Sequence, residues 1–414
     1  MWHGLPGRES YMTSRIAVVI LLAACALAED WPQFLGPARN GVYTGNDLAA
    51  KWPAGGPPVV WKKDAGAGFA SPVVAEGRLI LFHRVGDKEV VEALDAASGA
   101  AIWSFEYPTQ YRDDFGFDEG PRAAPTVSGG RVYTFGAEGM LHCLDFATGK
   151  KVWALDTRRQ FQVAKGFFGT AGAPLVDGGR VLMNIGGAAA GLAAFDAATG
   201  QTLWTVPNQE ASYSSPIAAT IQGARHALFF TRSGLVDVDP ANGKVRYELP
   251  WHARIRASVN AATPLVVDDF VFVSASYGTG AVLLQVGANG WKKVWESDDA
   301  LTNHYATSVY KDGFLYGYHG RQEEGQSLRC IEFKTGKVRW DVDGFGAGTV
   351  TLAGDKLLLM REGGELVLAA AAPGAFRRIA AAKILPGVVR AYPAIANGRM
   401  YVRNEKTLVG VDLK

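Results

Sequence analysis

Cysteine is scarce in this 414-residue chain, which has three in total, and only Cys143 and Cys330 lie beyond the first 28 residues. Two cysteines are too few for the disulfide framework that holds many small secreted domains together. An excess of charge of one sign is also missing, since 42 Lys and Arg oppose 40 Asp and Glu for a net charge of +2. Nucleic-acid binders usually carry a clear positive excess, so we expect no nucleic-acid partner.

The sequence also lacks the short motifs that carry metal or catalytic chemistry. The histidines show no His-x-His or His-Glu-x-x-His spacing, so we predict no metal site. No nucleophile elbow, phosphate-binding loop or paired-carboxylate motif is present. Catalytic residues therefore remain unknown at this stage, although a group assembled from distant segments would leave no such motif.

Long apolar runs are missing, apart from a short one near the N-terminus. Residues 16–24 are apolar and follow Arg15, and Met12 is an alternative start. This pattern predicts a signal peptide over residues 1–28, because the run is too short to span a bilayer. Cleavage before Glu29 would release a soluble chain, whereas lipidation of Cys25 in a lipobox-like segment would anchor it. Both alternatives predict an exported protein that is periplasmic or associated with the outer membrane, with no transmembrane segment in the mature chain.

Glycine, in contrast, is abundant at 50 residues, and much of it belongs to a repeat. Each copy has a Ser-Pro or Ala-Pro opening, three strand-like segments ending in Asp, a Thr-Gly-Lys turn and a Trp. The eighth copy stops at Lys414 after its third strand, and residues 58–64 resemble the missing fourth strand. We therefore predict an all-β fold, an eight-bladed β-propeller over residues 57–414 whose ring is closed by an N-terminal strand. Each blade would use about 48 residues, and residues 29–56 would form an extension across the propeller.

The repeated residues have mechanical roles. The Asp side chain is expected to bond the turn backbone, and the Gly to adopt positive φ. The Trp is expected to pack between blades and to need one partner for its indole N–H. The predicted structural residues are Trp61, Asp95, Gly99, Trp103, Asp145, Gly149, Trp153, Asp196, Gly200, Trp204, Asp239, Gly243, Trp295, Gly336 and Trp340.

The run from Leu144 to Trp153, Leu-Asp-Phe-Ala-Thr-Gly-Lys-Lys-Val-Trp, resembles the PQQ-type β-propeller repeat, and the resemblance extends over roughly residues 57–414. This family includes quinoprotein dehydrogenases, the outer-membrane assembly lipoprotein BamB and exported propellers of unassigned role. The opening Asp-Trp-Pro-Gln-Phe-Leu-Gly-Pro of residues 30–37 is similar to the start of that last group.

The resemblance implies a PQQ cofactor with calcium only for the quinoprotein members. Those enzymes are markedly longer and carry adjacent cysteines over the cofactor, a Trp floor and a Glu/Asn/Asp calcium set. Here Cys143 and Cys330 occupy equivalent positions in the second and sixth repeats. Opposite blades hold them too far apart for a disulfide. No calcium ligand can be matched, so we expect no cofactor.

A candidate site follows from aligning the repeats on their openings. One residue per blade then falls just before the innermost strand, at the mouth of the central channel: Phe69, Arg122, Ala171, Tyr213, Ala261, Tyr305, Gly346 and Arg390. Two arginines and three aromatic rings at one mouth would suit an anionic or planar ligand. The alternative is a solvated channel in which the arginines pair with nearby carboxylates.

Loops beside this ring offer further candidates. The loop from Tyr107 to Glu119 mixes aromatic and acidic residues, which suits contact with a partner or a carbohydrate. Asp114 and Asp118 are possible calcium contacts without the full calcium-loop pattern. His304 lies next to the ring position of the sixth blade.

Local positive patches are predicted in two other loops. Their residues are Arg158, Arg159 and Lys165 after the second blade, and His252, Arg254 and Arg256 after the fourth.

Three functions are compatible with these patterns. The leading hypothesis is a monomeric, exported, non-enzymatic binding or scaffold propeller of the bacterial cell envelope, with an envelope protein or a polysaccharide as partner. The alternative is a quinone (PQQ)-dependent oxidoreductase with its cofactor near Arg122, Tyr213, Tyr305 and Arg390. A carbohydrate-binding or carbohydrate-active propeller is the second alternative.

Overall fold

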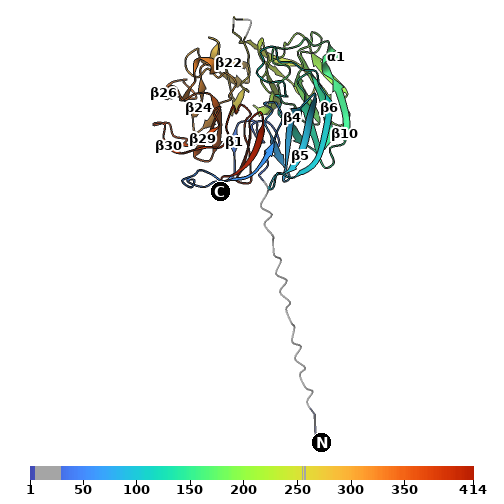
Figure 1. Ribbon diagram of the computed structural model, residues 1–414, viewed down its shortest axis with the longest axis vertical. Coiled ribbons are helices and arrows are strands. Elements are labelled where there is room, and N and C mark those ends of the chain that lie inside the picture. Colours follow the sequence, from blue (N-terminus) through green and yellow to red (C-terminus); the bar gives the residue numbers. More distant parts are fainter. Residues whose placement is uncertain (5–28, 254, 256–257) are drawn as a thin grey trace.

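The computed structural model describes residues 1–4, 29–253, 255 and 258–414. The predicted signal peptide beyond residue 4, including Met12 and Cys25, lies outside the described residues, as do Arg254 and Arg256. Eight four-stranded antiparallel sheets are arranged as the blades of a propeller (Figure 1). The predicted all-β, eight-bladed fold is confirmed.

The strands follow the repeats. Blade 1 is β3 (Val73–Ala75), β4 (Arg78–Val85), β5 (Lys88–Asp95) and β6 (Ala101–Pro108), and blade 2 is β7 (Thr126–Ser128), β8 (Arg131–Phe135), β9 (Met140–Asp145) and β10 (Lys151–Asp156). Blade 3 is β11 (Leu175–Asp177), β12 (Arg180–Asn184), β13 (Leu192–Asp196) and β14 (Thr202–Val206), and blade 4 is β15 (Ile217–Ile221), β16 (Ala224–Phe230), β17 (Gly234–Val238) and β18 (Val245–Pro250).

The second half continues in the same order. Blade 5 is β19 (Leu265–Val267), β20 (Phe270–Ala275), β21 (Gly280–Gly287) and β22 (Gly290–Ser297), and blade 6 is β23 (Val309–Lys311), β24 (Phe314–His319), β25 (Ser327–Glu332) and β26 (Val338–Val342). Blade 7 is β27 (Gly348–Ala353), β28 (Lys356–Arg361), β29 (Glu365–Ala370) and β30 (Arg378–Lys383). Helical structure in the described part of the chain is limited to α1 (Thr157–Phe161) and the 3-10 turn η1 (Gln322–Glu324).

Blade 8 closes the ring from both ends of the chain. It contains β31 (Ala394–Ala396), β32 (Arg399–Arg403) and β33 (Thr407–Asp412), and its outer strand is β2 (Val59–Asp64). The strands β2 and β33 pair antiparallel, with Trp61 opposite Gly410. In Figure 1 the first blue strands lie beside the red C-terminal strands. The predicted closure by an N-terminal strand is therefore confirmed, and it shortens the exposed sheet edges.

Tryptophan and glycine explain how neighbouring blades fit together. The Trp103 indole of blade 1 donates its N–H to the carbonyl of Phe146 in blade 2 at 3.0 Å. Gly149 lies directly against the same indole, where an added Cβ would come within 2.5 Å of the ring, and its φ is +71°. The same Trp–Gly contact recurs at Trp61–Gly99, Trp153–Gly200, Trp204–Gly243 and Trp295–Gly336.

One blade boundary uses a different contact. Tyr247 replaces the Trp of blade 4 and stacks on Trp291 of blade 5, with ring centroids 4.6 Å apart and an interplanar angle of 3°. Trp291 lies in the tight β21–β22 hairpin, whose turn at Asn289 and Gly290 departs from the repeat. The larger ring of Trp291 thus fills the space that a Trp–Gly pair fills elsewhere.

The N-terminal extension lies across one face of the propeller. Trp31 is buried and bridges to Val74 of blade 1, and β1 (Val42–Tyr43) adds a fifth strand, parallel to β27, on blade 7. Between these contacts, Arg39 is 2% exposed. Its guanidinium donates to backbone carbonyls of the innermost segments of blades 3 and 4, namely those of Pro174 and Pro216. The extension therefore inserts a cation between the inner strands.

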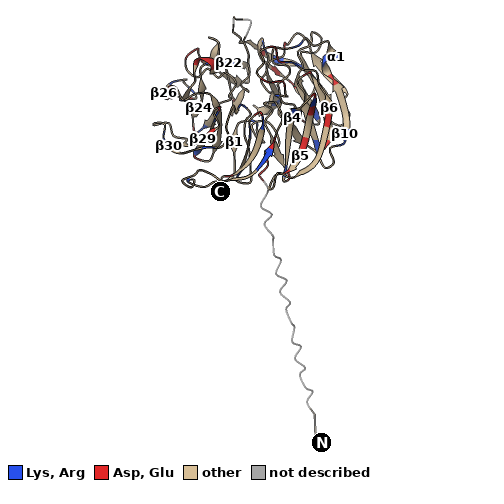
Figure 2. Ribbon diagram, in the orientation of Figure 1, with Lys and Arg blue, Asp and Glu red and all other residues tan. Residues whose placement is uncertain are grey.

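Cys143 and Cys330 are buried free thiols in β9 and β25, in blades 2 and 6 as expected. In the view of Figure 2, basic and acidic residues are interspersed over the blades. Among the described residues, no helix is long and apolar enough to cross a bilayer.

Candidate ligand cavity at the mouth of the central channel

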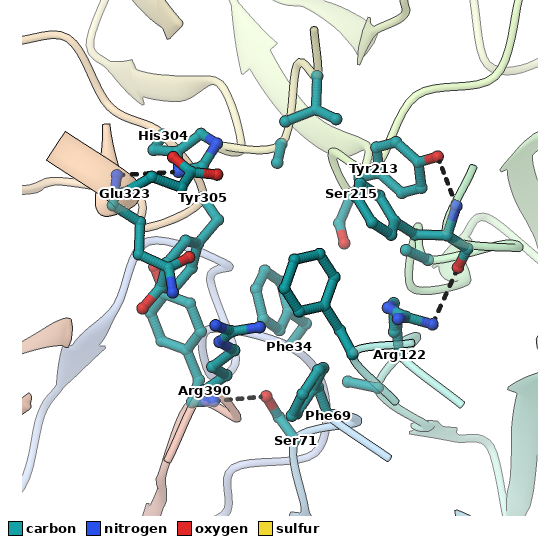
Figure 3. Close-up of a pocket in the computed structure, with 18 of the residues that line it drawn as sticks. Phe34, Phe69, Ser71, Arg122, Tyr213, Ser215, His304, Tyr305, Glu323 and Arg390 are labelled. Atoms are coloured by element: carbon teal, nitrogen blue, oxygen red, sulfur yellow. Dashed lines mark hydrogen bonds between the residues drawn. The ribbon is translucent and has the colours of Figure 1, made fainter. Parts of the chain in front are cut away.

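The predicted channel residues meet in one place. A cavity of about 240 Å³ is lined by Phe69, Arg122, Ala171, Tyr213, Ala261, Tyr305 and Arg390, together with residues that the repeats did not indicate (Figure 3). Gly346 is the exception, because it has no side chain to extend inward and its N–H is bonded to the carbonyl of Gln326. The structure thus assembles the ring at a site that is both aromatic and cationic.

The extension contributes to the cavity wall. Phe34 lines the cavity and meets Tyr392 edge-on, with ring centroids 5.1 Å apart. Its ring lies near the centre of the view in Figure 3. Arg39 follows five residues later and is bonded among the inner strands, so the extension supplies one aromatic ring to the cavity and one buried cation to the inner strands.

Arg122 is held by the protein itself. Its guanidinium donates to the carbonyls of Phe168 at 3.0 Å and Asp118 at 3.1 Å, and it pairs with Asp113 at 3.2 Å. The Asp113 carboxylate also accepts backbone N–H groups, including that of Phe117 at 2.8 Å. Although burial acts in the opposite direction, these bonds and Arg122 hold the pKa of Asp113 below its usual value, so this carboxylate stays ionised at neutral pH.

Arg390 is more available. Its Nε donates to Glu362 at 2.9 Å, and its guanidinium lies over the rings of Phe69 and Phe117 at 5.3 and 5.4 Å. Within the described residues, the two terminal nitrogens, Nη1 and Nη2, have no hydrogen-bond partner. Figure 3 shows the guanidinium pointing into the cavity. The ionic partner fixes one edge of the guanidinium and leaves the other edge facing the cavity.

Glu362 organises the wall beside Arg390. It lies in the turn between β28 and β29 and accepts hydrogen bonds from the Tyr305 hydroxyl and the Gln322 side-chain amide, both at 3.0 Å. Burial and the nearby carboxylate raise the pKa of the Tyr305 hydroxyl, which therefore remains a donor. The predicted residue Tyr305 thus offers its ring to the cavity and its hydroxyl to Glu362.

His304 forms a buried pair with Tyr277 in the cavity wall. Burial lowers the pKa of His304, which keeps the imidazole neutral near pH 7. Its Nδ1 accepts the backbone N–H of Gln322 at 3.3 Å, so the remaining ring proton is assigned to Nε2, which is 2.8 Å from the Tyr277 hydroxyl. The Tyr277 oxygen then accepts a hydrogen bond from Nε2–H, and its own O–H has no partner among the described residues. Tyr277 itself has a φ of +64°, an uncommon backbone for a tyrosine.

The aromatic loop predicted after blade 1 packs onto the cavity rim. Phe115 and Phe117 are about half exposed, at 53% and 51%, and both contact Phe168. Asp114 forms an ion pair with Lys165 rather than joining a group of acids. Asp118 accepts the backbone N–H of Gly68 at 2.9 Å. Within the described residues, no three His, Cys, Asp or Glu side chains are grouped to hold a metal ion.

The described residues of the predicted positive patches do not line this cavity. Arg158 and Arg159 belong to α1, beside Asp156 and Glu138. Lys165 and His252 line a second hollow of about 700 Å³, which adjoins the cavity because Ala171 and Tyr213 line both.

Several cavity residues were not indicated by the sequence. Tyr277 lies in a turn between the second and third strands of its blade, and Phe34 comes from the extension. The alignment considered only the position before each inner strand. The one available signal was the Tyr-Gly pair at 277–278, a turn signature that departs from the other repeats.

Fold, repeat and cavity together define an eight-bladed propeller of the PQQ repeat type. The chain belongs to the PQQ_2 family, described as outer membrane protein assembly factor BamB, which matches residues 87–342.

Curated relatives fall into two groups. Quinohemoprotein alcohol dehydrogenase ADH-IIG of Pseudomonas putida is 33% identical over 146 residues, which cover 33% of this chain and 20% of the dehydrogenase. Outer membrane protein assembly factor BamB of Moranella endobia is 22% identical over 282 residues, covering 65% of this chain and 68% of BamB. The match to the dehydrogenase thus spans about a fifth of that enzyme.

Solved structures show the same fold. The quinohemoprotein alcohol dehydrogenase from Comamonas testosteroni superposes with a TM-score of 0.67 at 16% identity, covering 92% of this chain and 80% of the enzyme. BamB from Moraxella catarrhalis superposes with a TM-score of 0.60 at 14% identity, covering 86% of this chain and 99% of BamB. Sequence identities this low are evidence of a shared fold alone.

Proposed function

We propose that the chain is an exported, non-enzymatic binding propeller of the bacterial cell envelope that holds its ligand in the cavity at the channel mouth. The observation that carries this proposal is the cavity itself, where aromatic walls surround one guanidinium edge without a hydrogen-bond partner among the described residues. Ligand sites commonly combine apolar walls with a few fixed polar groups. Among the described cavity residues, the Ser71 and Ser215 hydroxyls accept backbone N–H groups. In the one hydroxyl–imidazole pair among these residues, Tyr277 with His304, the imidazole is the donor, so binding is the chemistry that the cavity supports best.

An envelope location and an envelope partner belong to the same proposal. The family match and the BamB relative favour a role beside other envelope proteins. The exposed Phe115 and Phe117 at the cavity rim suit contact with such a partner or with a polysaccharide. Mass spectrometry of the mature N-terminus tests the location. A chain beginning at Glu29, or at a lipidated Cys25, is expected, whereas an uncleaved N-terminus would contradict export.

The second candidate is a PQQ-dependent oxidoreductase, which the dehydrogenase relatives favour. The arginines and aromatic rings fit the flat, anionic shape of PQQ. A calcium ion that helps to hold it does not fit, because the acidic side chain lining the cavity, Glu323, pairs with Arg321 at 3.5 Å and Asp113 is committed to Arg122. Of the residues that the structure describes, no tryptophan lines the cavity either. The residues present therefore do not match a calcium-held quinone.

The decisive experiment is a turnover assay of the purified mature protein with PQQ, calcium, a panel of primary alcohols and an artificial electron acceptor. We expect no acceptor reduction above that of PQQ alone. Turnover that saturates with alcohol and is lost in Arg390→Gln would overturn the non-enzymatic proposal. Arg361→Gln is the matched control, because Arg361 also pairs with a glutamate and lies over a phenylalanine, but outside the cavity.

A further inference from the structure

We infer that the cavity binds a flat aromatic monocarboxylate, without a metal ion, and that the ligand carries a neutral hydroxyl or carbonyl group at the end away from its carboxylate. This inference rests on the proposed binding function and adds the chemical class of the ligand. Three features carry it: the free edge of Arg390, the local balance of charge and the donor at Tyr277.

Arg390 is built to receive a carboxylate. The bond from Nε to Glu362 and the two phenylalanine rings beneath the guanidinium fix its plane. In the described part of the chain, Nη1 and Nη2 remain without a hydrogen-bond partner, and the guanidinium points into the cavity (Figure 3). A fixed guanidinium with one free edge matches the two oxygens of a carboxylate.

The charge around the cavity leaves no surplus cation for a second ligand carboxylate. Arg122 is paired with Asp113 and Arg390 with Glu362, whereas Arg321 is shared between two carboxylates, those of Glu323 and Glu324. Arg39 is different, because its guanidinium donates only to carbonyl, amide and hydroxyl oxygens, and no described carboxylate lies within 4 Å of it. Burial lowers its pKa to about 9, which still leaves it charged at neutral pH. This cation offsets the second carboxylate beside Arg321, so these groups carry no net charge and the free edge of Arg390 is matched by a single ligand carboxylate.

The wall at Tyr277 selects against a second carboxylate. The Tyr277 oxygen accepts a hydrogen bond from His304 Nε2–H, and its own O–H has no partner among the described residues. Glu323 also lines the cavity, and together with Glu324 it outweighs the charge of Arg321. A neutral hydroxyl can accept from Tyr277 and donate to Glu323, and a carbonyl can accept from Tyr277, whereas a second carboxylate would meet repulsion.

The surfaces between these two ends are aromatic. Phe34, Phe69, Tyr213 and Tyr305 line the cavity, and Phe34 is fixed edge-on against Tyr392. Such walls favour a flat ring over a flexible aliphatic chain. The volume of about 240 Å³ accommodates a one-ring or two-ring ligand.

The test is isothermal titration of the mature protein in EDTA with 4-hydroxybenzoate and three comparison probes. The first comparison is 4-hydroxybenzamide, which removes the charge. Terephthalate adds a second carboxylate, and benzoate removes the hydroxyl. We expect 4-hydroxybenzoate to bind at least tenfold more tightly than the amide or terephthalate.

Substitutions at Arg390 and Tyr277 test which residue binds each end of the ligand. Arg390→Gln is expected to weaken 4-hydroxybenzoate binding at least tenfold, while Arg361→Gln leaves it unchanged. Tyr277→Phe is expected to weaken 4-hydroxybenzoate several-fold and to leave benzoate binding unchanged, a difference that a general folding defect would not produce. Thermal melting of each variant shows whether it is folded.

Equal binding of the amide and the acid, or terephthalate binding as tightly as 4-hydroxybenzoate, would overturn the inference. Binding of PQQ with calcium that is lost in Arg390→Gln, without binding of 4-hydroxybenzoate, would overturn the ligand class and leave a binding function at this cavity intact. Failure of all these probes to bind would also overturn the ligand class, and the proposed function would then rest on the rim and a protein partner.

Discussion

A single methyl group at the blade boundary is expected to destabilise the ring. At Gly149, φ is +71° and an added Cβ would come within 2.5 Å of the Trp103 indole. Gly149→Ala should therefore lower the free energy of unfolding by about 3 kcal/mol, from backbone strain together with overpacking. The measurement is equilibrium unfolding in urea.

Gly179 provides the matched control for this change. Its φ is +76°, but nothing lies within 4 Å of the added Cβ. Gly179→Ala should lower the free energy of unfolding by only about 1 kcal/mol, the cost of the backbone conformation. If both variants lost the same free energy of unfolding, the clash with the indole would add nothing to the cost of the positive φ.

A buried histidine is expected to make stability depend on pH. His142 is 3% exposed and packs against Tyr107, with ring centroids 4.3 Å apart. Burial lowers its pKa to about 4. The unfolded chain binds a proton near pH 6.5 and the folded chain does not, so this group makes the protein lose stability as the pH falls from about 6.5 to about 4.

His142→Phe should keep the aromatic contact and remove this dependence. We expect the variant to lose less stability than the wild type between pH 7 and pH 5, measured by thermal melting at both values. A pH profile identical to that of the wild type would contradict the assignment of a neutral, buried imidazole.

The repeat residues were the most predictable part of the molecule, because each performs one local task. Asp145 and Gly149 form a turn, and Trp103 packs on the next turn, so a spacing of a few residues contains the whole interaction. Tyr277 and His304 could not be paired in this way, since one comes from a turn inside a blade and the other from a loop between blades. Side chains that meet across blades are separated by no fixed number of residues, so no sequence spacing indicates their contact.

At the scale of elements, the N-terminal extension is expected to stabilise the inner strands. Arg39→Met would remove the donor to the buried carbonyl of Pro216 and one of two donors to that of Pro174, which also accepts the Thr126 hydroxyl. We expect the free energy of unfolding to fall by about 2 kcal/mol, since the Pro216 carbonyl would lose its partner. Urea unfolding measures the loss.

Arg78→Met is the control, because Arg78 also donates to two backbone carbonyls, those of Phe146 and Ala147, but at the surface. Its loss should be below about 1 kcal/mol. A similar loss in both variants would argue that the extension merely covers the propeller face.

The presence of the extension was predictable from sequence, but its contribution to the cavity was not. The strand pattern begins only at Val59, and residues 29–56 contain little periodicity. Phe34 and Arg39 acquire their roles because the chain crosses the propeller face between Trp31 and β1, a path that no local signal specifies.

At the scale of the whole molecule, blade 8 contains a seam, the pairing of the N-terminal strand β2 with the C-terminal strand β33. We expect the blade boundary at this seam to be as stable as the other blade boundaries. Trp61 on the seam strand donates to the carbonyl of Ala96 at 3.1 Å, and Trp153 makes the equivalent bond to Ala197 at 3.1 Å. Trp61→Ala and Trp153→Ala should each lower the free energy of unfolding by about 3 kcal/mol.

Both variants should also unfold in a single transition, followed by tryptophan fluorescence and circular dichroism. A separate early transition in Trp61→Ala alone would show that the seam opens independently of the other blades.

The seam also sets an order of events in synthesis. The strand β2 is made among the first segments of the folded part, yet its partner β33 ends two residues before Lys414. Every incomplete chain therefore has an unpaired strand at its beginning and an open sheet edge at its growing end. The ring can form only after β33 has been made, so a ribosome that stalls before this strand leaves a product with two unpaired sheet edges rather than a smaller propeller.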